Sequence, residues 1–216
     1  MSQCALSETV LSALRSLGAA TVYEAQGQSG ALDAGIKPVA PQMRMVGPAL
    51  TVDCAPGDNL MIHYAMLKAR PGDILVVDAK GFVEAGAWGD VMTAQAQAMG
   101  LGGLLINGAV RDAETLAASG FPVFSRGLSI KATSKKMPGK IQTTVVIGGV
   151  PIRPGDVVVG DRDGVAVIPR EALDEIVAKS QAREEREADL RQQLTAGGNT
   201  VDLLGLRAVL QQYGLA

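Results

Sequence analysis

The sequence GAWGDVMTAQAQAMGLGGLLINGAVRD, residues 86–112, decides how we expect the chain to fold. It opens with a glycine-rich loop and continues through residues 91–99, which we interpret as a helix. Glycines then precede the apolar run 104–106, typical of a short buried strand, and a turn with Arg111 and Asp112 follows. Because such a helix–strand unit returns with a right hand, the two polar ends of the stretch can meet.

The charged residues at these ends suit a small anionic substrate. Asp90 and Asp112 could supply oxygen ligands or acid–base groups, and Arg111 offers a guanidinium fork for a carboxylate. The N–H groups of Val91 and Met92, at the helix start, would add an anion seat. Taken singly, Asp90 could simply cap the helix, and Arg111 with Asp112 could be a surface ion pair. Together they indicate a metal-assisted site.

Other kinds of site fit the sequence poorly. The loop lacks the third glycine of a dinucleotide fingerprint and the Gly-Lys-Ser/Thr of a phosphate-binding loop. The only histidine, His63, should lie mid-helix and pack, and neither Cys4 nor Cys54 has a visible partner. These observations disfavour nucleophilic catalysis and zinc. Oxygen ligands favour Mg²⁺ or Mn²⁺ as the cofactor.

Composition bounds the class of protein. The chain has 216 residues, of which 47% are hydrophobic and 19% charged, enough for one domain with a sizeable core. A net charge of -2 and 3% aromatic residues give no reason to expect a nucleic-acid partner. No segment resembles a signal peptide or an apolar run of about 18 residues, so we expect no membrane partner and a cytoplasmic location. Both cysteines should be reduced.

The sequence before this stretch predicts helices alternating with strands. Ser7 should cap a helix over 7–18, and Thr21 with Glu24 gives the Thr-x-x-Glu capping box of a second helix. Residues 43–54 should form a strand that Gly47-Pro48 interrupts. A helix over 59–69 and a buried strand over 74–78 then lead into the glycine-rich loop.

The sequence after it changes character. Residues 141–168 read as strand after strand, with a hairpin around Gly148-Gly149, so we expect an α/β or α+β layered domain with a mixed sheet. A long, highly charged helix over 170–194 and a short one over 201–213 follow. The long helix is either a solvated face or an arm that packs on a neighbouring subunit.

The combination of motifs resembles a known family. Gly-x-x-Gly-Asp, twenty residues and Arg-Asp are similar to the signature of the class II pyruvate aldolases. These are the 4-hydroxy-4-methyl-2-oxoglutarate/4-carboxy-4-hydroxy-2-oxoadipate aldolases, related to the regulator of RNase E activity A. The similarity covers nearly the whole chain. It includes TVYEAQG at 21–27, GPALTV at 47–52, RPGDILVVD at 70–78, FPVFSRG at 121–127, PGDVVVGD at 154–161 and DGVAVIP at 163–169.

The resemblance implies a role for each residue of the signature. Asp112 would hold the divalent ion, largely through waters, and Arg111 would bind the pyruvate end of the substrate with the backbone N–H groups of Val91 and Met92. Asp90 would position a water for proton transfer. Further expected residues are Gly86 and Gly89 for substrate binding, with Glu24 and Glu187 as outer-shell carboxylates from an adjacent subunit.

The family also implies a fold and an assembly. We expect a three-layer ββα sandwich of the swivelling-domain type over residues 1–169 and a C-terminal helical arm over 170–216. The arm should reach a neighbouring subunit in a homotrimer or homohexamer.

The implied reaction cleaves 4-hydroxy-4-methyl-2-oxoglutarate or 4-carboxy-4-hydroxy-2-oxoadipate through a pyruvate enolate, with oxaloacetate decarboxylation as a side activity. Catabolism of aromatic acids is the usual setting. The alternatives are a non-catalytic regulator related to the RNase E inhibitor and a dedicated oxaloacetate decarboxylase.

Overall fold

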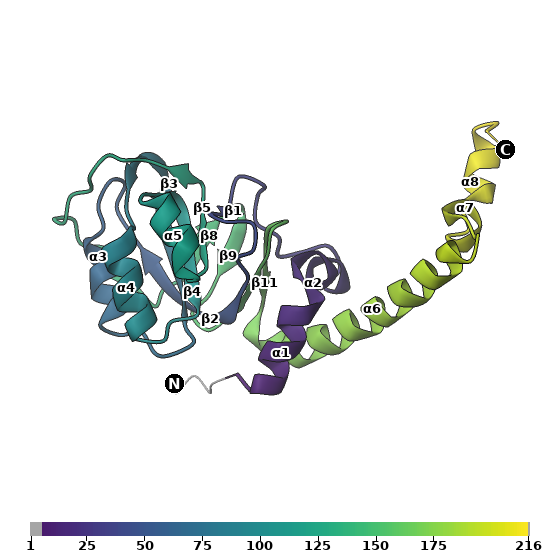
Figure 1. Cartoon of the computed structure of the whole chain (residues 1–216), viewed down its shortest axis with the longest axis horizontal. Coiled ribbons are helices and arrows are strands. Elements are labelled where there is room, and N and C mark those ends of the chain that lie inside the picture. The colour runs from purple at the N-terminus through teal and green to yellow at the C-terminus, as the bar shows by residue number, and fades with distance from the viewer. Residues whose placement is uncertain (1–5, 216) are drawn as a thin grey trace.

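The protein has a mixed α/β fold in the computed structural model, which describes residues 6–215 (Figure 1). The strands of the main sheet are β1 (Lys37–Pro38), β2 (Met45–Asp53), β3 (Ile74–Gly86), β4 (Gly103–Val110), β5 (Val123–Ser125), β10 (Val157–Gly160) and β11 (Val165–Ile168). Their order is β1-β5-β4-β3-β2-β10-β11. Strands β2 to β5 pair in parallel, whereas β1, β10 and β11 are antiparallel to their partners. Two short strands, β6 (Gly127–Leu128) and β7 (Lys140–Ile141), pair with β4 and β2.

The sheet curls until its two edges are close. Next to edge strand β11, Leu32 N donates to Val165 O at 3.0 Å and Val167 N donates to Gly30 O at 2.9 Å. The same segment then leads into β1 at the other edge, where Lys37 Nζ donates to Asp163 O. The sheet is therefore nearly closed and barrel-like, which leaves little exposed edge.

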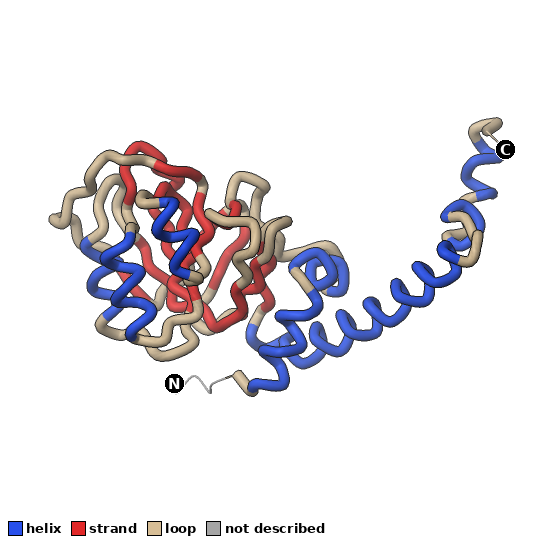
Figure 2. The backbone as a smooth tube through the Cα atoms, viewed as in Figure 1, coloured by secondary structure: helices blue, strands red, loops and turns tan. Residues whose placement is uncertain are grey.

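Helices and a hairpin cover the parallel strands. Helices α3 (Leu60–Met66), α4 (Asp90–Ala98) and α5 (Ala113–Ser119) pack together over one part of the sheet (Figures 1 and 2). The hairpin of β8 (Val145–Ile147) and β9 (Val150–Ile152) contacts β2 and β3. Ile74 to Val77 are fully buried, as expected for parallel strands covered on both faces. The expected three-layer α/β architecture is confirmed.

A second core joins the two ends of the chain. Helices α1 (Glu8–Leu17) and α2 (Ala19–Ala25), the 3₁₀ turn η1 (Arg170–Ala172) and the start of α6 (Leu173–Thr195) pack against β10 and β11. Leu14, Val22, Ile176 and Val177 are buried there. Beyond this core α6 extends away from the body and leads to α7 (Thr200–Leu203) and α8 (Arg207–Gln212) (Figure 1). The C-terminal helix is confirmed, while the domain division at residue 169 stays a prediction.

Three local predictions have different outcomes. Ser7 caps α1, because its Oγ accepts from Val10 N at 3.3 Å. The capping box at Thr21 is wrong: α2 already begins at Ala19, whose N–H donates to Asp161 Oδ2 at 2.8 Å. The interruption at Gly47-Pro48 is also wrong. Strand β2 runs straight through it, and the ladder to β10 ends there, so the missing N–H of proline costs little.

Two other expectations concern the environment of the protein. No helix within residues 6–215 is long and apolar enough to cross a membrane; the cytoplasmic location stays a prediction. Cys54 is a buried free thiol, and burial, with the charge of Asp58, raises its pKa to about 11. Cys4 lies outside the described residues.

Candidate active site

The two ends of the 86–112 stretch lie side by side. Strand β3 and strand β4 are parallel neighbours, and both are longer than the sequence suggested. After β3 the chain runs next to the end of β4, where Ala87 N donates to Ala109 O at 2.9 Å and Arg111 N donates to Trp88 O at 2.8 Å. These bonds set the start of α4 directly against Arg111. The predicted return of the helix–strand unit is confirmed.

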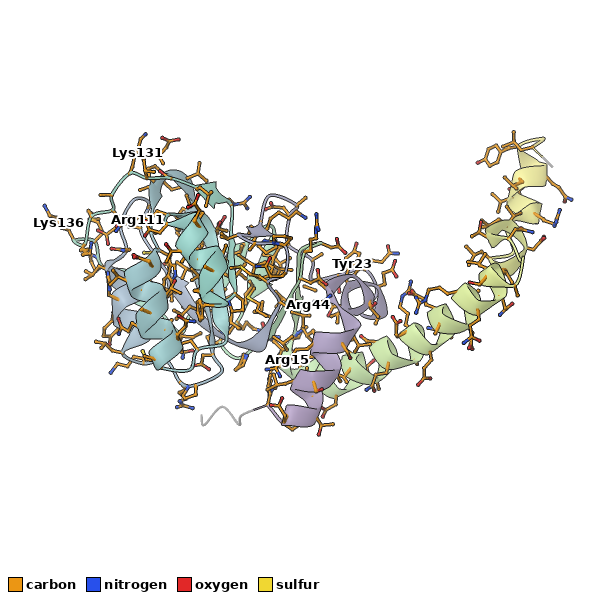
Figure 3. All side chains as sticks on the ribbon, viewed as in Figure 1. Arg15, Tyr23, Arg44, Arg111, Lys131 and Lys136 are labelled. Carbon is orange, nitrogen blue, oxygen red and sulfur yellow. The ribbon has the colours of Figure 1, made fainter. Side chains whose placement is uncertain are left out.

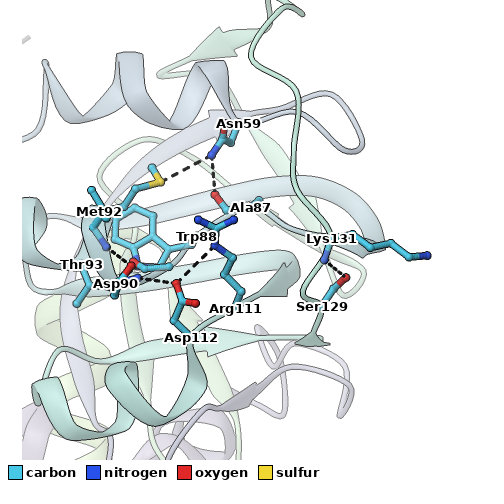
Figure 4. Close-up of polar contacts among 12 residues, drawn as sticks. Asn59, Ala87, Trp88, Asp90, Met92, Thr93, Arg111, Asp112, Ser129 and Lys131 are labelled. Carbon is cyan, nitrogen blue, oxygen red and sulfur yellow. Dashed lines mark hydrogen bonds and ion pairs between the residues drawn. The ribbon is translucent and has the colours of Figure 1, made fainter.

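Asp112 is the centre of the contacts in this region (Figure 4). Its Oδ2 accepts a hydrogen bond from Asp90 N at 3.1 Å and lies 3.5 Å from Arg111 Nε. The residue has φ 59° and ψ 40°, a left-handed conformation that asparagine and aspartate tolerate better than most residues. Its side chain is 35% exposed and that of Arg111 45%. An ion pair this exposed contributes little to stability, so stability alone does not explain the arrangement.

Gly86 and Gly89 allow this close approach. A Cβ at residue 89 would overlap Asp112 Oδ2 and lie 3.2 Å from Arg111 Nε. A Cβ at residue 86 would overlap Ser129 O and lie 2.9 Å from Arg111 Cβ. The φ of Gly89 is −155°, ordinary extended backbone, so space and not backbone strain requires glycine there. Both glycines therefore shape the site around Arg111.

Asp90 is the first residue of α4, and Gly89 is the N-cap. The Asp90 carboxylate bends back, so that Oδ1 accepts from Val91 N at 2.7 Å. Thr93 N bonds to Gly89 O at 3.1 Å. Within the described residues this leaves Met92 N as the first-turn amide without a hydrogen bond. Of the two backbone N–H groups expected to bind the substrate anion, that of Val91 donates to Asp90 and that of Met92 is available.

A cavity of about 240 Å³ lies over these groups. Its wall comes from α3, from residues 86–92, from Arg111 and from the loop 132–135. Trp88 belongs to this wall, but its ring is buried, stacks on Phe121 with centroids 6.2 Å apart and donates from Nε1 to Thr93 Oγ1 at 2.6 Å. The buried Trp88 ring therefore forms an apolar backing to a cavity that Asp90 and Arg111 also line.

A larger cavity of about 460 Å³ lies elsewhere, next to α1 and β2. Arg15, Arg44 and Arg70 line it, and Figure 3 shows Arg15 and Arg44 far from Arg111. Its one carboxylate, Asp73, is buried and accepts from Arg70 N at 2.9 Å. The smaller cavity is the better candidate for catalysis, because Arg111 and the Asp90 carboxylate line it and the Asp112 carboxylate lies next to them.

Asp58, which the sequence did not indicate as a site residue, anchors the loop that forms one wall of the pocket. Its Oδ2 accepts from Ser134 Oγ, from Lys136 N at 2.7 Å and from Met137 N at 3.1 Å, while Oδ1 accepts from Leu60 N at 2.8 Å. Burial raises the pKa of this carboxyl, but the four hydrogen bonds outweigh burial and lower it to about 2. In the sequence Asp58 ends Pro56-Gly57-Asp58, a pattern that indicates a tight turn and not a functional site.

The segment 131–137, which we call the strap, is held in place by these bonds. Its other end is fixed where Gly86 N donates to Lys131 O at 3.0 Å. Thr133 and Lys135 of the strap face the cavity. Figure 3 shows Lys131 and Lys136 at the same end of the molecule as Arg111. The strap adds positive charge beside the pocket.

His63 lies mid-helix as expected, but its ring does more than pack. It lines the cavity, and its Nε2 is buried without a hydrogen bond in the structure. Burial lowers the His63 pKa, and the charge of Lys135 lowers it further, so the imidazole is neutral at pH 7.

Glu24 and Glu187 are not part of this chain's own pocket. Both form ion pairs with Arg183 of α6, the one to Glu187 at 2.9 Å. They lie where α2 meets α6, away from α4 in Figure 1. A contribution from an adjacent subunit stays a prediction.

The donors present fit a water-rich site for Mg²⁺ or Mn²⁺. In the described part of the chain no three His, Cys, Asp or Glu side chains gather closely enough to hold a metal ion. Mg²⁺ is commonly bound by one or two carboxylates, with waters and substrate completing the shell. The Asp112 carboxylate, partly exposed beside the pocket, meets that requirement.

Comparison with known proteins identifies the family of the chain. The RraA-like family, described as Aldolase/RraA, matches residues 10–167. A protein of Halalkalibacterium halodurans, named as a candidate 4-hydroxy-4-methyl-2-oxoglutarate aldolase, is 42% identical over 153 residues, which are 71% of this chain and 73% of that protein.

Two solved structures are also similar. An uncharacterized protein from Pseudomonas syringae has a TM-score of 0.80 and 30% identity over 91% of this chain and 96% of its own. RraAS2 from Streptomyces coelicolor, described as an unusual member of the RNase ES inhibitor RraA family, has a TM-score of 0.78 and 27% identity over 87% of this chain and 98% of its own. The chain thus belongs to the RraA-like family, which includes aldolases and RraA proteins.

Proposed function

We propose that the protein is a divalent-metal-dependent pyruvate aldolase. It cleaves 4-hydroxy-4-methyl-2-oxoglutarate or 4-carboxy-4-hydroxy-2-oxoadipate, and it decarboxylates oxaloacetate as a side reaction. One observation carries the proposal: Asp90, Arg111 and Asp112 converge at the first turn of α4, where Asp90 and Arg111 line a pocket of a size for small acids and Asp112 lies beside it. The name of the relative from Halalkalibacterium halodurans supports the same reaction class.

Different residues at the pocket bind the substrate carboxylate and the metal ion. Arg111 holds the substrate carboxylate with a charge-assisted hydrogen bond, and Met92 N adds a backbone donor. Val91 N joins them when the Asp90 carboxylate turns away from it. Asp112 would hold Mg²⁺ or Mn²⁺, and the bound ion would supply Lewis-acid stabilisation of the charge that develops on the 2-oxo group.

Proton transfer is the second task. A water held by Asp90 and Arg111 takes the proton of the 4-hydroxyl group. The C4–O bond becomes a carbonyl, the C3–C4 bond breaks, and its electron pair leaves with C3 as the pyruvate enolate. C3 then accepts a proton to give pyruvate. The other product is pyruvate or oxaloacetate, according to the substrate. Oxaloacetate forms the same enolate when it loses CO₂.

The assembly is part of the proposal. Helices α6 to α8 reach away from the body and end in exposed apolar side chains, among them Leu204, Val209 and Tyr213. Such a surface is typical of a protein interface. We propose that the arm packs on another copy of the chain in a trimer or hexamer, and that Glu24 and Glu187 complete a neighbouring pocket.

A second candidate is a regulator without catalysis, as the similarity to RraAS2 suggests. A third is a dedicated oxaloacetate decarboxylase. A lactate-dehydrogenase-coupled assay separates the three. Pyruvate should appear from 4-hydroxy-4-methyl-2-oxoglutarate with Mg²⁺ or Mn²⁺ and stop with EDTA. Turnover of oxaloacetate alone would favour the decarboxylase. No turnover of any of the three substrates would reject catalysis of this kind.

A further inference from the structure

Two residues that line the candidate pocket, one at the start of α3 and one within it, each carry a buried polar atom without a partner. Asn59 Oδ1 and His63 Nε2 are both buried and have no hydrogen-bond partner, and both residues line the 240 Å³ cavity. Asn59 is the N-cap of α3 and His63 lies one turn further along the helix. Buried polar groups are normally paired with protein, water or ligand, so these two atoms are available to pair with a bound ligand.

The orientation of the Asn59 amide is fixed by its neighbours. Its Nδ2 donates to Ala87 O at 3.0 Å and lies 3.8 Å from Met92 Sδ (Figure 4). If the side-chain amide were reversed, Asn59 Oδ1 would lie against Ala87 O, and two acceptor oxygens would repel each other. Asn59 N in turn donates to Ser134 O of the strap at 3.0 Å. The unpaired atom of this pocket residue is therefore Oδ1, an acceptor that needs a donor.

His63 complements this acceptor. A neutral imidazole carries one N–H and one lone pair, so Nε2 can donate or accept. The ring is held neutral at pH 7 by its buried position near Lys135. A carboxylate has no proton to give Asn59 Oδ1, whereas a hydroxyl donates to one group and accepts from the other. An acceptor and a donor side by side therefore suit a hydroxyl group of the substrate better than a carboxylate.

We infer that Asn59 and His63 form the subsite that binds the 4-hydroxyl group of the substrate. Asn59 Oδ1 accepts from the hydroxyl when the substrate binds, before the proton passes to the water held by Asp90 and Arg111, and His63 Nε2 donates to the hydroxyl oxygen. The inference rests on the proposed function, and it adds two substrate-binding residues to those of the 86–112 stretch. It makes Asn59 and His63 the groups that orient the C4–O bond while Arg111 holds the carboxylate.

The test compares two reactions that share the enolate. Cleavage of 4-hydroxy-4-methyl-2-oxoglutarate needs the hydroxyl, whereas exchange of the methyl hydrogens of pyruvate in D₂O, followed by NMR, does not. His63→Phe should lower kcat/KM for cleavage about tenfold, the loss expected for one hydrogen bond, and leave exchange within about twofold. His63→Gln, which keeps a polar group at similar reach, should recover most of the loss. Tyr64→Phe is the matched control, because Tyr64 is exposed on the same helix.

Any other result for the His63 variants contradicts the proposed subsite or the proposed function. If both reactions fall together in His63→Phe and His63→Gln, the residue is structural; if neither falls, it does not touch the substrate. Both results overturn the subsite. If His63→Phe does not fold, as judged by its thermal melting, the ratio of cleavage to exchange in His63→Gln decides: a ratio equal to that of wild type rejects the inference. A wild-type protein that catalyses neither reaction rejects the proposed function and the subsite with it.

Discussion

The buried carboxylate of Asp58 allows a prediction whose size follows from the structure. In Asp58→Asn an N–H₂ group must replace one carboxylate oxygen, and both oxygens accept N–H groups: Oδ1 from Leu60, Oδ2 from Lys136 and Met137. The carboxyl titrates near pH 2 in the folded protein, against 3.8 ordinarily. That difference corresponds to about 2 kcal/mol of folding free energy at neutral pH.

The dependence on pH has a definite sign. Because folding lowers the pKa of Asp58, its stabilisation is complete above the unfolded value of 3.8 and is lost as the pH falls toward about 2. The difference in unfolding free energy between wild type and Asp58→Asn should be about 2 kcal/mol at pH 7 and about half of that at pH 3. Urea titrations followed by circular dichroism at both values measure it.

A control variant and a functional readout accompany this experiment. Asp189→Asn, which changes an exposed carboxylate on α6, should alter stability by less than about 0.5 kcal/mol. Because Asp58 anchors the strap that carries Thr133 and Lys135, its loss should raise KM more than it lowers kcat. A difference of equal size at pH 3 and pH 7 would refute the assignment of the stabilisation to the ionised carboxylate.

Three further predictions concern the site and the core. Gly89→Ala should displace the Asp112 carboxylate and weaken Mn²⁺ binding about tenfold or more in calorimetry; an unchanged affinity would show that the pocket has room for the methyl group. Arg111→Lys keeps the charge but loses the guanidinium fork, so kcat/KM should fall roughly 10- to 100-fold, and wild-type kinetics would remove Arg111 from carboxylate binding. Leu14→Ala, in the core shared by α1 and α6, should cost about 2–5 kcal/mol in urea titration, and a loss below about 1 kcal/mol would mean that this core repacks freely.

Much of the central unit could be predicted because its signals are local. Apolar runs, glycines and the single charged residues at each end define a helix and a strand, and handedness brings the ends together. The sequence also placed Ser7 as a cap and Gly148-Gly149 in a hairpin, and both placements are confirmed. In each case the deciding residues are only a few positions apart.

The features that sequence reasoning missed depend on residues far apart in the chain. Thr21 has the pattern of a cap, but Asp161, 142 positions after Ala19, supplies the carboxylate at the true start of α2. Asp58 reads as a turn residue until the strap folds over it, 76 positions later. His63 reads as a packing residue because nothing nearby in sequence shows that its helix forms a pocket wall.

The measurement that tests the proposal most directly combines metal removal with a change at Asp112. Pyruvate release from 4-hydroxy-4-methyl-2-oxoglutarate is followed in wild type and in Asp112→Asn, after EDTA treatment and again after addition of Mn²⁺. Wild type should lose its activity with EDTA and regain it with Mn²⁺, while Asp112→Asn should stay inactive in both conditions. Activity that persists in EDTA, or an Asp112→Asn variant that Mn²⁺ restores to wild-type turnover, would contradict a metal-dependent aldolase site at Asp112.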